Sequence, residues 1–173
     1  VPVLLGHLPG HRETEPNDSA ETALRIAWPS AVHGRIGEAD DEDRFGIVAA
    51  KGDRLRLRLR ASEFNSALDP VMRVEDATGK QLARDDDSGE RQDAKLDWTA
   101  PADGTYHLAV SDLIRSGGSA HFYRLEIDRV TPSLNATITP DRLVVEAGKS
   151  VEATVTIGFA DGYNGKTAVV VRG

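Results

Sequence analysis

The sequence predicts an all-β protein whose main part is a two-layer antiparallel sandwich or jelly roll. The first observation is alternation with a period of two, clearest in Arg54–Arg60, where leucines take one face and arginines the other. The second is the set of turn signals between short apolar runs, such as Lys51-Gly52-Asp53 and Asp103-Gly104. The third is the scarcity of helical patterns, since the single expected helix is Ser19–Ile26, after the capping residues Asn17 and Asp18.

Each expected strand is a short run with one apolar face, bounded by the Gly, Pro, Asp and Ser residues that favour turns. In chain order, the expected strands of the sandwich are Val32–Ile36, Phe45–Val48, Arg54–Arg60, Val71–Val74, Leu96–Trp98, Tyr106–Val110 and Phe122–Ile127. The arginines of Arg54–Arg60 are expected to form the solvated face of their strand, where acids on an adjacent strand neutralise them. The alternative is that they bind an acidic partner.

The pattern of runs and turns divides the chain into three parts. Residues 1–12 are expected to be an N-terminal strand or the tail of a preceding module, and residues 13–130 form the sandwich. After Thr131-Pro132 a new pattern begins, with expected strands at Asn135–Thr139, Leu143–Glu146 and Val151–Ile157. Residues 131–173 are too few for an immunoglobulin-like sandwich of about 100 residues. We therefore expect an incomplete second β module there.

Composition excludes several classes of function. The 173 residues carry a formal net charge of −7, which argues against a nucleic-acid partner because that class needs clustered positive charge. The absence of cysteine excludes disulfides, thiolate metal sites and cysteine nucleophiles. No apolar run is long enough to span a membrane, so we expect no membrane insertion. Without a Gly-x-Ser-x-Gly or His-Glu-x-x-His motif, the sequence also favours a non-catalytic protein.

Two segments concentrate carboxylate and amide oxygens. The first is Glu13–Asp18 and the second is Glu38–Asp43, directly before the strand expected at Phe45. Calcium takes six to eight oxygen ligands of these types. Glu13, Glu15 and Asn17 share a face of an extended segment, and Asp18 follows Pro16. The hypothesis is one divalent-cation site between the segments, and the alternative is two solvated acidic loops.

The order of these motifs resembles the bacterial pre-peptidase C-terminal domain, a family that includes the collagen-binding domains of clostridial collagenases. The resemblance covers about residues 13–127. It rests on Glu13-x-Glu15-Pro16-Asn17-Asp18, Gly34, Asp40-x-x-Asp43-x-Phe45, Gly52-Asp53, Leu68-Asp69-Pro70, Asp76-x-x-Gly79 and Ala100-Pro101-Ala102-Asp103-Gly104-Thr105-Tyr106. The tail from Pro132, with Ile138-Thr139-Pro140-Asp141, resembles the start of an immunoglobulin-like module.

The resemblance implies a jelly-roll β-sandwich attached to a large secreted or cell-surface bacterial protein, often a protease. Such a module spaces, stabilises or targets neighbouring domains of the same polypeptide, which are its expected partners. Calcium is the implied cofactor, held between the N-terminal linker and an early loop. Carried over by motif, the ligands are Glu13, Glu15, Asn17, Asp18, Asp40, Asp43 and a backbone carbonyl near Arg35.

Two alternatives remain open. The module could bind an extracellular protein or polysaccharide, and collagen-binding members use surface tyrosines. Here Tyr106 and Tyr123 are expected in the core, and Tyr163 lies outside the resemblance. The second alternative is another cation at Asp85-Asp86-Asp87, which we instead expect to form a solvated hairpin turn.

Overall fold

The structure, a computed structural model, describes residues 7–89, 91 and 93–170, in two compact units of residues 1–129 and 130–173. The expected N-terminal strand or tail at residues 1–12 lies partly outside the described residues. Its described part contains β1 (Gly10–Arg12), which pairs in parallel with β3 (Ser30–Arg35). Among the described residues there is no helix with the length and apolar character needed to cross a membrane.

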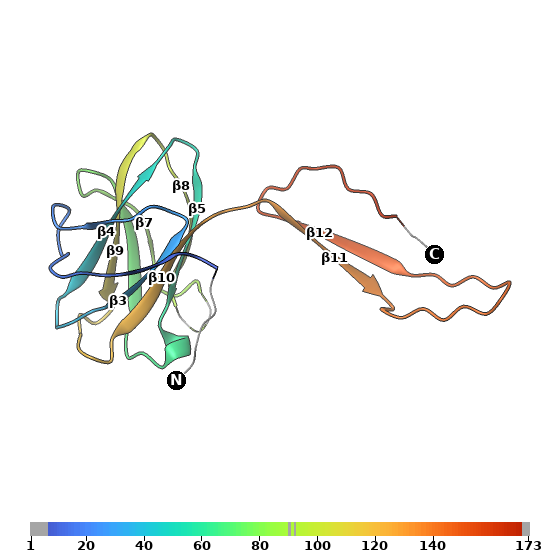
Figure 1. The fold of residues 1–173 in the computed structure, drawn as a ribbon, viewed down its shortest axis with the longest axis horizontal. Coiled ribbons are helices and arrows are strands. Elements are labelled where there is room, and N and C mark those ends of the chain that lie inside the picture. Colours follow the sequence, from blue (N-terminus) through green and yellow to red (C-terminus); the bar gives the residue numbers. More distant parts are fainter. Residues whose placement is uncertain (1–6, 90, 92, 171–173) are drawn as a thin grey trace. The chain divides into compact units, whose positions relative to one another are not determined.

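The first unit contains two five-stranded sheets (Figure 1). Sheet A has the order β1-β3-β10-β5-β8, with β10 at Phe122–Arg129, β5 at Arg54–Arg60 and β8 at Lys95–Thr99. Sheet B has the order β2-β4-β9-β6-β7. Its strands are β2 (Leu24–Arg25), β4 (Glu42–Ala49), β9 (Gly104–Asp112), β6 (Pro70–Glu75) and β7 (Gln81–Asp85).

Alternation along the strands fills the space between the sheets. Leu55, Leu57 and Leu59 are at most 1% exposed, and Leu57 and Leu59 pair in register with the inward residues Ile127 and Leu125 of β10. From sheet B, the buried core includes Phe45, Ile47, Met72, Val74 and Leu108. The apolar face predicted for Arg54–Arg60 is therefore the core face of the sandwich, and the arginines lie on the other side.

The expected strands of the sandwich all lie in or overlap observed strands, but two local predictions are wrong and one strand was not predicted. The segment Ser19–Ile26 is not a helix: a turn closed by Ser19 and Thr22 precedes β2, which pairs with Phe45 and Gly46. Side chains of Ser and Thr compete with helical backbone bonds, and the sheet edge takes the rest of the segment. The sequence pattern missed β7, and Leu143–Glu146 forms no strand.

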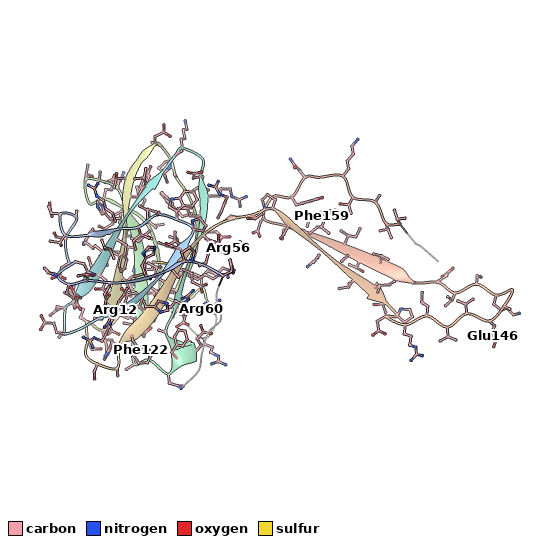
Figure 2. The ribbon with its side chains drawn as sticks, viewed as in Figure 1. Arg12, Arg56, Arg60, Phe122, Glu146 and Phe159 are labelled. Carbon is pink, nitrogen blue, oxygen red and sulfur yellow. The ribbon has the colours of Figure 1, made fainter. Side chains whose placement is uncertain are left out.

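The second unit contains one antiparallel hairpin, β11 (Ser133–Thr139) with β12 (Thr154–Ala160). Leu134 pairs with Phe159, Ala136 with Ile157 and Ile138 with Val155, so the apolar residues share one face. Phe159, labelled in Figure 2, is 58% exposed. Its ring also stacks on that of Tyr163. A two-stranded sheet with an exposed apolar face has little stability of its own.

Candidate metal centre

The acidic segment Glu13–Asp18 carries the chain from sheet A to sheet B. It begins directly after β1, where the backbone N–H of Glu13 donates to the carbonyl of His33 at 3.1 Å. It reaches β4 at its other end, where the carbonyls of Asn17 and Asp18 accept from the backbone N–H and Nε of Arg44, both at 3.0 Å. The segment therefore links β1, an edge strand of sheet A, to β4, the second strand of sheet B.

Two inward side chains meet across the sandwich beside this segment. Asp43 points inward from β4 and is 0% exposed, and Tyr123 points inward from β10 and is 2% exposed. The Tyr123 hydroxyl donates to Oδ2 of Asp43 and lies 3.3 Å from Oε2 of Glu13. Glu13 is fixed from its other oxygen, Oε1, which accepts from the backbone N–H of Arg35 at 2.6 Å. A phenol and two carboxyl groups are thus brought together at the end of the core.

Gly34 makes this approach possible. It is the register partner of Tyr123 on the neighbouring strand. A Cβ at Gly34 would lie well inside van der Waals contact with Oε2 of Glu13 and with Cζ and the hydroxyl of Tyr123. The position therefore requires glycine because of the space available. Backbone conformation is not the reason, since the φ of Gly34 is not left-handed.

The carboxylates converge closely enough to share a cation. Glu13, Glu15 and Asp43 each offer an oxygen within 4.8 Å of the others, and Glu15, Asp18 and Asp41 form a second such group. Oxygens bound to one calcium ion at 2.3–2.6 Å can be at most about 5 Å apart. Glu15 belongs to both groups, so the five carboxyl groups form one continuous cluster.

Buried oxygens without partners test whether the cluster fits a cation. Asn17 is 0% exposed, and its Oδ1 and Nδ2 have no hydrogen-bond partner. Oδ1 of Asp43 is also buried without a partner. An unsatisfied buried polar group costs about 1–3 kcal/mol. An amide oxygen and a carboxylate oxygen are ligands that calcium prefers, so these two orphaned acceptors fit a calcium ion.

The protonation energetics of the cluster agree with this fit. Burial, then the neighbouring carboxyl group of Glu13, raises the pKa of Asp43 to about 9. Burial also raises the pKa of Glu13, and burial together with Asp41 and Glu13 raises the pKa of Glu15. Carboxyl groups this close repel one another when ionised. A divalent cation would remove that repulsion.

The raised pKa of Asp43 predicts a pH dependence for chelator-treated protein. The unfolded chain loses the carboxyl proton of Asp43 at about pH 4. The folded protein keeps this proton up to about pH 9. Stability from this group is therefore fully present below about pH 4 and is lost as pH rises toward about 9. We expect the Asp43→Asn variant to lack this fall in urea unfolding measured from pH 5 to 9. Identical pH profiles for the two proteins would contradict the assignment.

The structure brings together Glu13, Glu15, Asn17, Asp18 and Asp43 of the residues expected to bind calcium. Asp40 is placed differently: it pairs with Arg115 at 3.3 Å, and Asp41 takes the position beside Glu15 and Asp18. Asp40 has a left-handed backbone, φ 65°, at the bend, which turns successive side chains in different directions. Arg35 contacts the cluster through its backbone N–H, which donates to Glu13. A backbone carbonyl near Arg35 as a calcium ligand remains a prediction.

Sequence reasoning missed Asp41 and Tyr123 as parts of the cluster. The acidic run Glu38–Asp43 contains Asp41, but spacing alone did not distinguish it from Asp40. Tyr123 was correctly expected in the core, as was Tyr106 at 4% exposure. Asp85 accepts from the backbone N–H of Ser88 and of Lys95, at 3.1 and 2.7 Å, and therefore closes a turn.

These features define residues 7–129 as a β-sandwich domain with an oxygen-lined cluster at one end. The fold is that of a bacterial pre-peptidase C-terminal domain, as the sequence motifs predicted. The pre-peptidase C-terminal domain of a Bacillus anthracis collagenase matches with a TM-score of 0.51 and 14% identity, over 67% of this chain and 100% of that domain. A periplasmic inhibitor of g-type lysozyme from Aeromonas hydrophila matches with a TM-score of 0.49 and 14% identity, over 61% and 94% of the two chains.

A curated sequence relative is a probable subtilase-type serine protease of Deinococcus radiodurans. It is 34% identical over 110 residues, which are 60% of this chain and 15% of that protease. The matched region is therefore a small part of the relative's length. No family model matches the sequence.

Proposed function

We propose that residues 13–130 are a non-catalytic accessory module of a larger exported bacterial protein of the protease type, stabilised by one calcium ion. The sandwich fold shared with a collagenase's pre-peptidase C-terminal domain supports the module assignment. The local identity to a subtilase-type protease supports the kind of parent protein. Neighbouring domains of the same polypeptide are the proposed partners, and the proposed location is secreted or cell surface.

One observation carries the calcium proposal: the carboxylates of the two segments converge, and the same segments hold two buried acceptors that have no partner, Oδ1 of Asn17 and Oδ1 of Asp43. Solvated acidic loops would expose such oxygens to water. Bound calcium would supply positive charge and coordination to both. The proposed ligands are Glu13, Glu15, Asn17, Asp18, Asp41 and Asp43, and Asp41 replaces Asp40 of the motif-based set.

Hydrogen bonds within the protein hold the crossing segment beside both sheets. Arg35 holds Glu13 through its backbone N–H, and Arg44 holds the carbonyls of Asn17 and Asp18. These bonds position the crossing segment against β3 and β4. The ion would tie that segment to Asp43 of β4 and so connect the two sheets. Extracellular modules bind calcium with a Kd of about 10⁻⁴–10⁻³ M, so calcium would occupy this site outside the cytoplasm.

Calcium titration tests the proposal directly. We expect isothermal titration of chelator-treated protein to show one calcium ion per chain, with a Kd of about 10⁻⁴–10⁻³ M. Magnesium should bind more weakly, because it prefers six ligands at about 2.0–2.1 Å and gives up its water reluctantly. No detectable binding at millimolar calcium would refute the proposal.

Matched variants locate the site. The double variant Glu15→Gln/Asp18→Asn should abolish calcium binding, since Glu15 belongs to both carboxylate groups. The control Asp86→Asn/Asp87→Asn removes the same charge from the other acidic turn and should leave binding unchanged. Loss of binding in the control instead would move the site to the Asp85–Asp87 turn.

A further inference from the structure

The outer face of sheet A is basic in a chain whose net charge is −7. Residues paired in register on neighbouring strands point to the same side of a sheet. The register therefore places Arg12, His33, Arg124 and Arg60 in one row across β1, β3, β10 and β5. The next row places Arg58 beside Lys95. Figure 2 labels Arg12, Arg56 and Arg60 on this sheet.

Carboxylates on this face neutralise only part of the charge. Asp97 receives two hydrogen bonds from Arg56, at 2.7 and 2.6 Å. Glu126 accepts from Arg124 at 3.0 Å and from Arg60 at 3.2 Å. Within the described part of the chain, Arg58 and Lys95 form no ion pair, and Lys95 is exposed.

The outer face of sheet B shows what full neutralisation looks like. There Arg44 pairs with Glu42 and Glu75, and Arg73 pairs with the same two acids. Each arginine of that group meets two carboxylates. On sheet A, Arg60 likewise meets two carboxylates, Glu63 and Glu126, but the guanidinium of Arg58 and the ammonium of Lys95 form no ion pair with the described residues.

A cavity of about 370 Å³ opens on the basic face. Its lining includes Arg58, Arg60 and Lys95. Two acids lie on its wall. Asp93 accepts from the backbone N–H groups of Ala61 and Ser62 and from the Ser62 hydroxyl, at 3.0–3.2 Å. Glu63 accepts from Arg60 at 3.1 and 3.3 Å. Both acids therefore have partners within the protein, and the remaining cations of the lining, which include Arg58 and Lys95, favour an anionic group.

We infer that the outer face of sheet A binds a polysaccharide that carries carboxylate or sulfate groups, with Arg58 and Lys95 at the centre of the contact. Guanidinium groups bind such anions through paired hydrogen bonds. Every second residue of a strand repeats at about 6.8 Å, so the outward arginines of β5 repeat at about this spacing along the strand. A polymer with an anion on each repeat matches such a row.

The same face disfavours other polyanions. Single-stranded nucleic acid is bound through aromatic stacking, and Phe122 is the exposed aromatic that the register places here, at 38% exposure. Acidic peptides are anchored by side chains in apolar pockets, whereas the lining of this cavity is largely charged. This inference does not depend on the calcium proposal.

Binding to immobilised polymers tests the inference. The probes are heparin and polygalacturonate, with dextran as the neutral polymer, and polyglutamate and a single-stranded oligonucleotide as the other polyanions. We expect the protein to bind the two acidic polysaccharides, and added salt should weaken this binding because it screens exposed charges. Equal or tighter binding to polyglutamate, the oligonucleotide or dextran would overturn the choice of ligand.

Charge reversal locates the surface. Arg58→Glu/Lys95→Glu should weaken polysaccharide binding by about tenfold, because two exposed attractions become repulsions. The control Lys51→Glu/Lys80→Glu makes the same change in net charge at exposed turns and should stay within about twofold of the parent protein. Equal losses in the two variants would show that net charge, not this face, governs binding. Unchanged thermal unfolding of each variant establishes that the fold is intact.

Discussion

Calcium is expected to raise the stability of the chelator-treated protein by about 2.7 kcal/mol when its concentration is a hundredfold above Kd, because it would bind the folded state alone. The cation would satisfy the buried oxygens of Asn17 and Asp43 and remove repulsion among the carboxylates around Glu15. Urea unfolding at constant pH and ionic strength, with calcium at a hundredfold above the titrated Kd and with excess chelator, measures the difference. Coincident unfolding curves would rule out a structural role for calcium.

The Asp43→Asn variant is a further test, because its effect on stability should differ between the chelator-treated and the calcium-bound protein. With chelator, the variant should be as stable as the parent or more stable, since a buried carboxyl group whose pKa is raised to about 9 has been replaced by a neutral amide. With calcium, it should lose most of the gain of about 2.7 kcal/mol. Asp141→Asn removes the same charge from an exposed site in the second unit and should keep the full calcium response.

Substituting Gly34 with alanine is expected to have the second large effect. The new Cβ would overlap Glu13 and Tyr123, which cannot both move because Tyr123 bonds to Asp43 and Glu13 bonds to Arg35. Overpacking of a well-filled site costs about 1–3 kcal/mol. We also expect weaker calcium binding, since Glu13 is displaced from the cluster.

Gly104→Ala is the matched control, because a Cβ there meets nothing within 4 Å and its backbone is not left-handed. Its stability and calcium affinity should stay close to those of the parent protein. Urea unfolding and calorimetric titration of both variants make the comparison. If Gly34→Ala behaved like the control, the close approach of β3 and β10 would not be required for the cluster.

Local patterns predicted the strands of the sandwich well. Arg54–Arg60 was predicted residue for residue, because a strand with one buried face must alternate and the leucines reveal that face. Turn residues bounded the other strands to within a few positions. The errors fell where local preference was weak: Ser19–Ile26 has helix-forming residues but its end pairs with β4, and β7 is only half-buried.

The acidic cluster shows the limit of spacing arguments. The segments Glu13–Asp18 and Glu38–Asp43 were correctly placed together, because both are rich in the same ligands and flank early strands. Which aspartate faces inward depended on the left-handed bend at Asp40 and on Arg115, a residue far along the chain. Tyr123 joined the cluster through its strand register with Gly34.

The sequence by itself determined the all-β class, the core face of each main strand and the two segments that carry the candidate metal ligands, because alternation and ligand chemistry are local properties of the chain. Only the tertiary structure decided that Asp41 takes the place expected for Asp40, that Asn17 and Asp43 are buried without partners, and that basic residues of four strands form one row. These depend on strand order and register, which are set by packing between residues distant in sequence.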